Sequence, residues 1–314
     1  MIKNKKILIA GGNGFIGTNL CERLYKDNEI TIIDSESSSP NKREFWKEKG
    51  IKYIYAPIQD VLFIDSDVYD IIINLACVAS PPLYQNEPVF TMDTCYIGTK
   101  RLLERMAKNT IFLQASTSEI YGDSLNDIQY EVDRGNVNCY GPRACYDEGK
   151  RIAETLCYEW ARKGYNTKIV RIFNTYGPHM SLNDGRLIPN LLSQALKNEP
   201  LTIYGDGNQT RSFQYIDDLI DGIISLLESN INTPVNIGNP EEITVNDLVN
   251  IIKTELNLPE DYPIEYKKLP VDDPTHRKPG ITKARVLLNY EPKVKIKQGI
   301  QKLISWINTT NMII

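Results

Sequence analysis

A phenol and an ammonium group stand one helical turn apart in this chain. Tyr146 and Lys150 occupy positions i and i+4 of a stretch with helical periodicity, which places both side chains on one face. An ammonium beside a phenol favours the phenolate, so we expect Lys150 to lower the pKa of Tyr146 towards neutrality. Thr117, at the end of a predicted strand, is placed to hydrogen-bond the same substrate oxygen. These groups suit the removal of a proton from an alcohol.

A glycine-rich loop supplies the second half of such chemistry. "GGNGFIG" (11–17) follows an apolar strand and opens a helix, with Gly11, Gly14 and Gly17 spaced as G-x-x-G-x-x-G. Such glycines let the backbone approach a pyrophosphate at the helix N-terminus. Asp34, at the end of the second strand, is placed to bind ribose hydroxyls and to repel a 2′-phosphate. The pattern therefore predicts NAD as cofactor and hydride acceptor.

Further positions complete the predicted cofactor site. Glu36 adds negative charge beside the ribose, whereas Lys42 and Arg43 are cations that would suit the phosphate of NADP. We expect the remaining contacts from the helix start, from strand ends and from the phenol–ammonium pair: Phe15, Ile16, Asp60, Val61, Leu75, Ala76, Tyr146 and Lys150. Asp60 and Val61 are the candidates for the adenine pocket.

Strands that alternate with helices must position these groups. Apolar runs predict strands at 5–10, 29–34, 52–56, 70–76, 110–116 and 167–173, and helical patterns cover 14–27, 88–108 and 143–163. This alternation indicates βαβ units and a doubly wound parallel sheet of Rossmann type.

From about residue 177 the predicted elements become shorter, and prolines separate them. We predict a Rossmann domain over 1–176, with a returning segment near 212–240 whose strand at 232–239 rejoins the sheet. Residues 177–314 are expected to form a smaller α/β substrate lobe.

Composition excludes several classes of protein. The 314 residues carry a formal net charge of −4 with no long basic run, which argues against nucleic-acid binding. No apolar run approaches the ~20 residues of a membrane helix, and six scattered cysteines with two histidines lack zinc-site spacing. We therefore expect no metal, reduced thiols and a cytoplasmic location.

Longer stretches resemble the extended short-chain dehydrogenase/reductases, and among them the UDP-glucuronate decarboxylases (UDP-xylose synthases). The resemblance rests on 116–123 ("STSEIYGD"), 141–159 ("GPRACYDEGKRIAETLCYE"), 171–178 ("RIFNTYGP"), 183–186 ("NDGR"), 201–219, 235–242 and 276–284. It covers nearly the whole chain. It implies a nucleotide-sugar substrate held by the C-terminal lobe. It also implies a homodimer that pairs through the helices at about 88–108 and 143–163.

The resemblance also implies roles for individual residues. Tyr146, helped by Lys150 and Thr117, would take the proton of the carbon-4 hydroxyl while the hydride passes to NAD. The resulting β-keto acid would lose carbon dioxide, and return of the hydride would give UDP-xylose. Glu119 stands where the family has a carboxylate near the reacting carbon, and Arg277 where it has a guanidinium near the substrate.

The nucleotide half of the substrate needs its own contacts. Arg211 suits a pyrophosphate through a forked, charge-assisted pair, and Arg186 and Arg277 are placed to share that anion. The substrate site expected from the sequence comprises Ser118, Glu119, Asn174, Arg186, Tyr204, Arg211 and Arg277. Asn174 is assigned to the phosphates and Tyr204 to the base.

Three departures from the family pattern leave the substrate open. The family's "KTN" is replaced by Asp93, Thr94 and Cys95, "NLACVASPP" (74–82) replaces "HLASPASPP", and 34–43 lacks a glycine after the ribose-binding acid. An acid facing the sugar would disfavour glucuronate. The alternative is a 4-dehydrogenase or 4-epimerase acting on another UDP-, GDP- or dTDP-linked sugar for surface glycan or capsule. A non-catalytic NAD-binding regulator is a third hypothesis, which the retained Tyr146 and Lys150 disfavour.

Overall fold

The structure is a computed structural model that describes residues 2–61, 69–269 and 277–310. Its centre is one parallel sheet in the order β11-β6-β5-β4-β1-β2-β3. The direction of winding changes between β1 and β4, as in a doubly wound Rossmann sheet, so the predicted fold class is confirmed. The strands are β1 Lys6–Ala10, β2 Glu29–Asp34, β3 Lys52–Tyr55, β4 Ile71–Asn74, β5 Ile111–Thr117, β6 Asn166–Ile172 and β11 Val235–Ile237.

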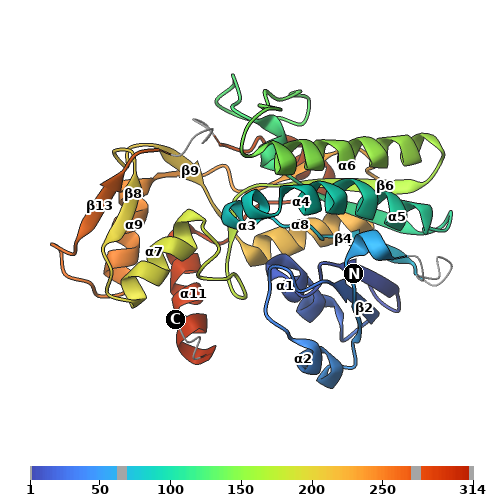
Figure 1. Ribbon diagram of the computed structural model, residues 1–314, viewed down its shortest axis with the longest axis horizontal. Helices are drawn as coiled ribbons and strands as arrows, with labels where there is room; N and C mark the ends of the chain where they lie inside the picture. Colours follow the sequence, from blue (N-terminus) through green and yellow to red (C-terminus); the bar gives the residue numbers. More distant parts are fainter. Residues whose placement is uncertain (1, 62–68, 270–276, 311–314) are drawn as a thin grey trace.

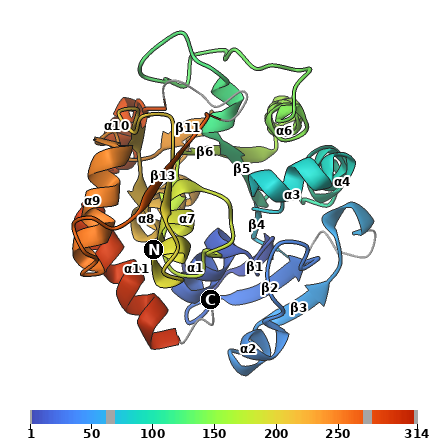
Figure 2. The ribbon, with the colours of Figure 1, turned by 60° about the vertical axis from the view of Figure 1, so that its left-hand side comes forward.

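The first strand is apolar over Ile7 to Ala10 because helices cover both faces of the sheet. Ile7, Leu8, Ile9 and Ala10 of β1 are fully buried. Figures 1 and 2 show α6 with α4 on one side of the sheet and α1 with α8 on the other. These helices are α1 Phe15–Leu24, α4 Pro88–Asp93, α5 Thr99–Glu104, α6 Ala144–Arg162 and α8 Ile216–Glu228.

The helical pattern at 88–108 is interrupted in the structure. A π-helical turn, Thr94–Gly98, separates α4 from α5 and packs against α6. Small side chains on α6, at Cys145, Gly149, Ala153 and Cys157, repeat every four residues and permit this close packing. π-turns inside helices are rare and are found mostly at functional sites.

The C-terminal elements are short and gather beside the sheet, where α7, β8, β13, α9 and α11 lie together (Figure 1). β13 pairs with β8 in parallel, β12 pairs with β9 in antiparallel fashion, and β11 returns to the main sheet beside β6. The predicted division at residues 176 and 177 stays a prediction. The bounds are β7 Thr175–Tyr176, α7 Leu187–Leu196, β8 Leu201–Tyr204, β9 Thr210–Ser212, β10 Gln214–Tyr215, β12 Glu242–Thr244, α9 Val245–Glu255, β13 Ile264–Lys267, α10 Thr282–Leu288 and α11 Ile296–Thr310.

Short helices and 3₁₀ turns follow the carboxyl ends of strands β2, β3, β4 and β5 in the sequence. They are α2 Arg43–Glu48, a 3₁₀ turn at Ile58–Asp60, α3 Pro81–Asn86 and a 3₁₀ turn at Ser118–Tyr121. Among residues 2–61, 69–269 and 277–310, no helix has both the length and the apolar content needed to cross a membrane.

Candidate active site

One large cavity lies at the carboxyl ends of the parallel strands, between the sheet and the C-terminal elements. Its volume of about 1570 Å³ exceeds the ~300–1,000 Å³ of a typical single-ligand site, so it has room for two ligands side by side. One side, here called the sheet wall, carries the loop 11–17, Cys77, Thr117, Tyr146 and Lys150. The opposite side, the loop wall, carries Asp184, Arg186, Tyr204 and Arg211.

The glycine loop has the shape that a dinucleotide pyrophosphate requires. Gly11 has a φ of +75°, and a Cβ added there would lie 2.8 Å from the backbone nitrogen of Ala76. A Cβ on Gly17 would overlap the carbonyl oxygen of Gly11. Gly14 caps α1, and the first residues of this helix, Phe15, Ile16 and Gly17, line the cavity. The loop therefore fits NAD, with the pyrophosphate at the helix N-terminus.

Asp34 lies at the tip of β2 and lines the cavity next to this loop. Its carboxylate accepts hydrogen bonds from the backbone N–H of Asn13 at 3.0 Å and of Glu36 at 2.8 Å. Burial raises the pKa of Asp34, and these two hydrogen bonds oppose that rise. The position suits a ribose diol, as the sequence predicts.

The nearby cations are already engaged by the protein. Arg43 forms a forked pair with Glu36, at 2.8 and 2.7 Å. Lys42 donates to the hydroxyl of Thr18 at 3.0 Å and lies 3.3 Å from the carbonyl oxygen of Asn13. Neither arrangement offers a cation to a 2′-phosphate without breaking these contacts, which agrees with NAD rather than NADP.

The predicted adenine contacts fall beside the cavity and not in its lining. Asp60 is exposed and Val61 is buried, and neither lines the cavity. Ile58 and Gln59, from the same 3₁₀ turn, do line it. The assignment of Asp60 and Val61 to the adenine pocket stays a prediction. Leu75 and Ala76, after β4, line the cavity as expected.

Tyr146 and Lys150 lie one turn apart on the buried face of α6, and both line the cavity. The Thr117 hydroxyl is near enough to lower the pKa of the Tyr146 phenol, and Lys150 Nζ donates to the carbonyl oxygen of Ala115 at 3.0 Å. The Tyr146 ring stacks on Tyr84, with centroids 5.2 Å apart and planes at 10°. The structure thus brings the predicted phenol, ammonium and hydroxyl together.

The expected lowering of the Tyr146 pKa is wrong. Burial raises the pKa of this phenol well above its ordinary value, and Cys77 adds to the rise, while the Thr117 hydroxyl and the charge of Arg186 oppose it. The Lys150 ammonium donates a hydrogen bond to the backbone carbonyl of Ala115, and its Nζ lies 5.8 Å from the Tyr146 ring centroid. The spacing in the sequence predicts that the ammonium stands one turn from the phenol, but it does not show how deeply the phenol is buried.

A compact charge cluster lies next to the phenol. Glu119 pairs with Arg143 and, at 3.1 Å, with Arg277, which also donates to the carbonyl oxygen of Ser118. Burial raises the pKa of Glu119, but Arg277 and Arg143 outweigh it, so the net shift is downward. Ser118 and Glu119 line the cavity, whereas Arg277 is 4% exposed and reaches it only through Glu119.

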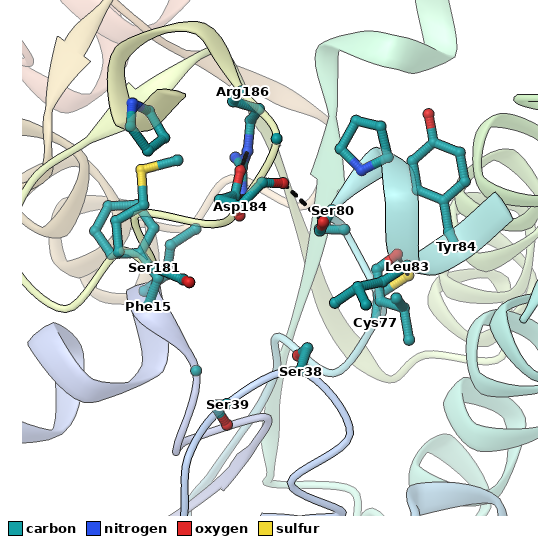
Figure 3. Close-up of a pocket in the computed structure, with 18 of the residues that line it drawn as sticks. Phe15, Ser38, Ser39, Cys77, Ser80, Leu83, Tyr84, Ser181, Asp184 and Arg186 are labelled. Carbon is teal, nitrogen blue, oxygen red and sulfur yellow. Dashed lines mark hydrogen bonds and ion pairs between the residues drawn. The ribbon is translucent and has the colours of Figure 1, made fainter. Parts of the chain in front are cut away.

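The loop wall holds the remaining predicted substrate residues. Arg186 forms a forked ion pair with Asp184, whose second contact measures 2.8 Å. The Ser80 hydroxyl donates to the carbonyl oxygen of Asp184 at 2.7 Å and so bridges the two walls (Figure 3). Tyr204, at the end of β8, and Arg211, on β9, line the same side, and Asn174 lines the cavity after β6.

Several residues of the site escaped the sequence reasoning. Tyr84, Arg143, Asp184 and Cys77 all line the cavity, and Figure 3 shows Tyr84, Cys77 and Asp184 around it. Arg143 stands in the same "GPRACY" stretch that identified Tyr146, so its proximity was available from the sequence. The stacking of Tyr84 on Tyr146 joins residues 62 positions apart and leaves no local signal.

Asp93 is not among the described residues that line the cavity, although Phe90 and Thr94 on either side of it are. The condition that made this acid unfavourable for an anionic sugar, an inward side chain, is therefore not met. Cys95, the neighbouring departure, is 3% exposed and lies behind the sheet wall. Within the described ranges, no group of three or more His, Cys, Asp or Glu side chains has metal-binding geometry.

Comparisons with known proteins agree with this arrangement. Residues 7–238 match the NAD dependent epimerase/dehydratase family. The chain is 43% identical over 310 residues to the UDP-glucuronic acid decarboxylase 1 of Danio rerio, covering 97% of this chain and 73% of the relative. This chain belongs to the NAD-dependent epimerase/dehydratase family. It is accordingly an NAD-dependent enzyme of the extended short-chain dehydrogenase/reductases.

Solved structures of the family share the fold over nearly the whole chain. The UDP-glucose 4-epimerase of Thermotoga maritima, solved with UDP-glucose, has a TM-score of 0.88 at 25% identity and covers 98% of this chain and 99% of its own. The UDP-glucuronic acid 4-epimerase of Bacillus cereus, solved with UDP-glucuronic acid and NAD, has a TM-score of 0.84 at 26% identity, covering 97% and 99%. Both relatives bind a nucleotide sugar.

Proposed function

We propose that the protein is a UDP-glucuronate decarboxylase that converts UDP-glucuronate to UDP-xylose. The similarity to named decarboxylases extends over 97% of the chain at 43% identity. Structural relatives solved with UDP-sugars support the substrate class. The sugar itself is argued from the charges around the phenol.

The observation that carries the proposal is the excess of cations at the reacting end of the cavity. Arg143 and Arg277 pair with the single carboxylate of Glu119, and Arg186 also influences that carboxylate. Asp147, the nearest further acid on α6, has its pKa raised to about 7 by burial, so part of its population is neutral near that pH. With Asp93 outside the lining, this end of the site suits a negatively charged sugar.

The side chains can then be assigned to steps. NAD, when bound at loop 11–17 and Asp34, would supply the acceptor and donor of a hydride at carbon 4. In its phenolate form, which the charge of Arg186 favours against burial, Tyr146 Oη takes the proton of the carbon-4 hydroxyl, and Lys150 stands one turn away. In the 4-keto sugar the carboxylate is β to the ketone, so its carbon–carbon bond breaks and leaves an enolate. Thr117 and Tyr146 are placed to hydrogen-bond the enolate oxygen.

The decisive experiment incubates the purified protein with NAD and UDP-glucuronate. We expect release of carbon dioxide, measured by trapping the gas, and formation of a UDP-pentose, measured by mass spectrometry. Turnover of UDP-glucuronate to an isomer of unchanged mass, without carbon dioxide, would reject decarboxylation. Turnover of uncharged sugar nucleotides alone would reject the anionic substrate.

The alternative is a 4-epimerase or 4-dehydrogenase, and the similarity to a UDP-glucuronic acid 4-epimerase favours the first of these. An epimerase must turn the keto sugar over before the hydride returns, whereas a decarboxylase must let the carboxylate leave first. The same incubation therefore separates them by product. UDP-galacturonate as product would establish the epimerase.

We also propose that two chains pair through α4 and α6. Apolar side chains are exposed on this face, with exposures from 38% to 63%: Val89, Met92, Tyr96, Ile152 and Tyr158. The three residues on α4 and the π-turn follow a helical spacing, so they form one stripe. Light scattering should give the mass of a dimer. The expected cytoplasmic location stays a prediction.

A further inference from the structure

Two cysteines meet at the back of the sheet wall. Cys77 follows β4 and lines the cavity, where Figure 3 shows it next to Leu83 and Tyr84. Cys95 lies in the π-turn Thr94–Gly98 and is 3% exposed. Their Sγ atoms are 3.3 Å apart, and both thiols are free. One thiol is thus accessible from the cavity and the other lies directly behind it.

The pair adjoins the helical turn that carries the phenol and the ammonium. The Lys150 side chain acts on Cys77 and lowers the pKa of its thiol. A Cβ added to Gly149, between Tyr146 and Lys150, would lie 3.1 Å from the Sγ of Cys95. Because α6 has so little free space here, a movement of Cys95 is transmitted to this turn.

The two thiols are electrostatically unequal. The hydrogen bond from Cys95 lowers the pKa of Cys77 against the effect of burial, and the Lys150 ammonium lowers it further. The hydrogen bond to Cys77 and burial both raise the pKa of Cys95. Cys77 is therefore the better nucleophile, and Cys95 keeps its proton, which is the division of roles in a reactive and resolving thiol pair.

We propose that Cys77 and Cys95 form a redox modification site, in which a peroxide oxidises the pair to a disulfide that reversibly inactivates the enzyme. The sulfur of Cys77 attacks the O–O bond of the peroxide, gives a sulfenic acid and releases water or an alcohol. Cys95 Sγ then attacks that sulfur, the S–O bond breaks, and the oxygen leaves as water with the Cys95 proton. A dithiol reduces the disulfide and is itself oxidised, which restores both thiols.

The effect on the enzyme follows from the geometry. Bond formation brings the two sulfur atoms from 3.3 Å to the ~2.05 Å of a disulfide and removes the thiol on which the Lys150 charge acts. Displacement of a catalytic group by about 1 Å can cost about 10²-fold in rate. Ligands in the cavity should cover Cys77, so NAD with the sugar nucleotide should slow its oxidation.

The test treats the reduced, full-length protein with hydrogen peroxide and maps its peptides without reduction. We expect a linked pair of peptides that contain Cys77 and Cys95, the loss of two hydrogen atoms per chain, and reversal by dithiothreitol. Turnover should fall by up to about 10²-fold and return on reduction. Oxidation that leaves these two thiols unlinked would overturn the proposed site.

Two variants sharpen the result, each compared with its own reduced form. Cys95→Ser should form no linked peptides, because Cys77 then has no resolving thiol and carries a sulfenic acid or a higher oxide in place of the disulfide. Cys139→Ser removes an exposed thiol outside the pair and should behave like the wild type. A disulfide between Cys77 and another cysteine in oxidised Cys95→Ser would contradict the pairing. A linked pair with unchanged turnover would refute the inactivation.

The inactivation part rests on the proposed function, since it needs a substrate that turns over. The peptide map does not, because it records chemistry on the protein alone. If UDP-glucuronate is not turned over but the linked peptides form, the function fails and the thiol site stands. If turnover occurs and no linked peptides form, the thiol site fails alone.

Discussion

The two walls of the cavity are built in different ways. On the sheet wall, Thr117 ends a central strand and Tyr146 and Lys150 stand on a 19-residue helix that packs against that strand. On the loop wall, Asp184 and Arg186 belong to the segment between β7 and α7, and Arg211 lies on a three-residue strand. The Ser80 hydroxyl, in the segment after β4, donates to the carbonyl oxygen of Asp184 at 2.7 Å and so connects the two walls. Figure 3 shows this hydrogen bond.

This difference suggests that the sheet wall carries the proton-transfer groups and the loop wall holds the charged ligand. Groups that move protons need fixed positions, and the sheet supplies them through buried backbone on both sides. Groups that hold a long, charged ligand can adjust with it, and loops that carry forked ion pairs allow this. Changes to the sheet wall should therefore lower kcat, and changes to the loop wall should mainly raise KM.

The largest effect is expected for Tyr146→Phe. Loss of the phenol removes the proton acceptor at carbon 4 and should lower kcat by about 10³-fold, with NAD binding retained. Tyr84→Phe is the matched control, because the Tyr84 hydroxyl has no hydrogen-bond partner among the described residues and its ring keeps the stack. Steady-state turnover of UDP-glucuronate and an NAD titration measure both. Equal losses in the two variants would contradict the assigned role of Tyr146.

Gly11→Ala should damage the sheet wall by geometry alone. At a φ of +75° alanine is strained by about 1–3 kcal/mol, and its Cβ would also crowd the backbone of Ala76. Gly50→Ala is the matched control: its φ is +72° but no atom lies within 4 Å of the added Cβ. Thermal unfolding should therefore show a larger loss of stability for Gly11→Ala, with weaker NAD binding. Equal losses would mean that strain, and not crowding, dominates.

The elements of the sheet wall were predictable because their signals are local. Continuous apolar runs predict the strands to within about two residues. The spacing of Tyr146 and Lys150 needs only the helical period. The glycine loop follows directly from a strand and opens a helix, so its place is fixed by neighbours in sequence.

What could not be predicted depends on contacts between distant segments. The pairing of Glu119 with Arg277 spans 158 residues, and the stack of Tyr84 on Tyr146 spans 62. The π-turn at Thr94–Gly98 looks like ordinary helix in the sequence, since the same residues suit both. The raised pKa of Tyr146 depends on burial, which no spacing reveals. Residue types on the loop wall were predicted, but Asp184 as the partner of Arg186 was not.

Arg186→Ala tests the loop wall. The variant removes a forked cation that Asp184 orients at the cavity, and charged hydrogen bonds of this kind contribute about 1.5–3 kcal/mol. We expect kcat/KM to fall by about 10–100-fold, mainly through a higher KM. Asp184→Asn keeps the cation but loosens its orientation, so its effect should be smaller. A fall confined to kcat would break the division between the walls.

The smallest effect concerns the burial of Asp147, which follows Tyr146 on α6. Burial raises the pKa of this carboxyl from 3.8 to about 7, and one of its oxygens has no hydrogen-bond partner among the described residues. The folded protein therefore holds a proton that the unfolded chain releases near pH 4. The stability contributed by this proton is present below about pH 4 and is lost as the pH rises to about 7, with a slope of at most ~1.4 kcal/mol per pH unit.

Asp147→Asn should remove this slope while keeping the shape of the side chain. Urea unfolding at several pH values between 5 and 8 should show the wild type losing stability relative to the variant as the pH rises to about 7, and parallel curves above it. Glu148→Gln removes a carboxylate from the half-exposed neighbouring position and should follow the wild-type curve. If all three curves were parallel from pH 5, water would reach Asp147. The neutral form of Asp147 near pH 7, which leaves the cations at the reacting end of the cavity in excess, would then be refuted.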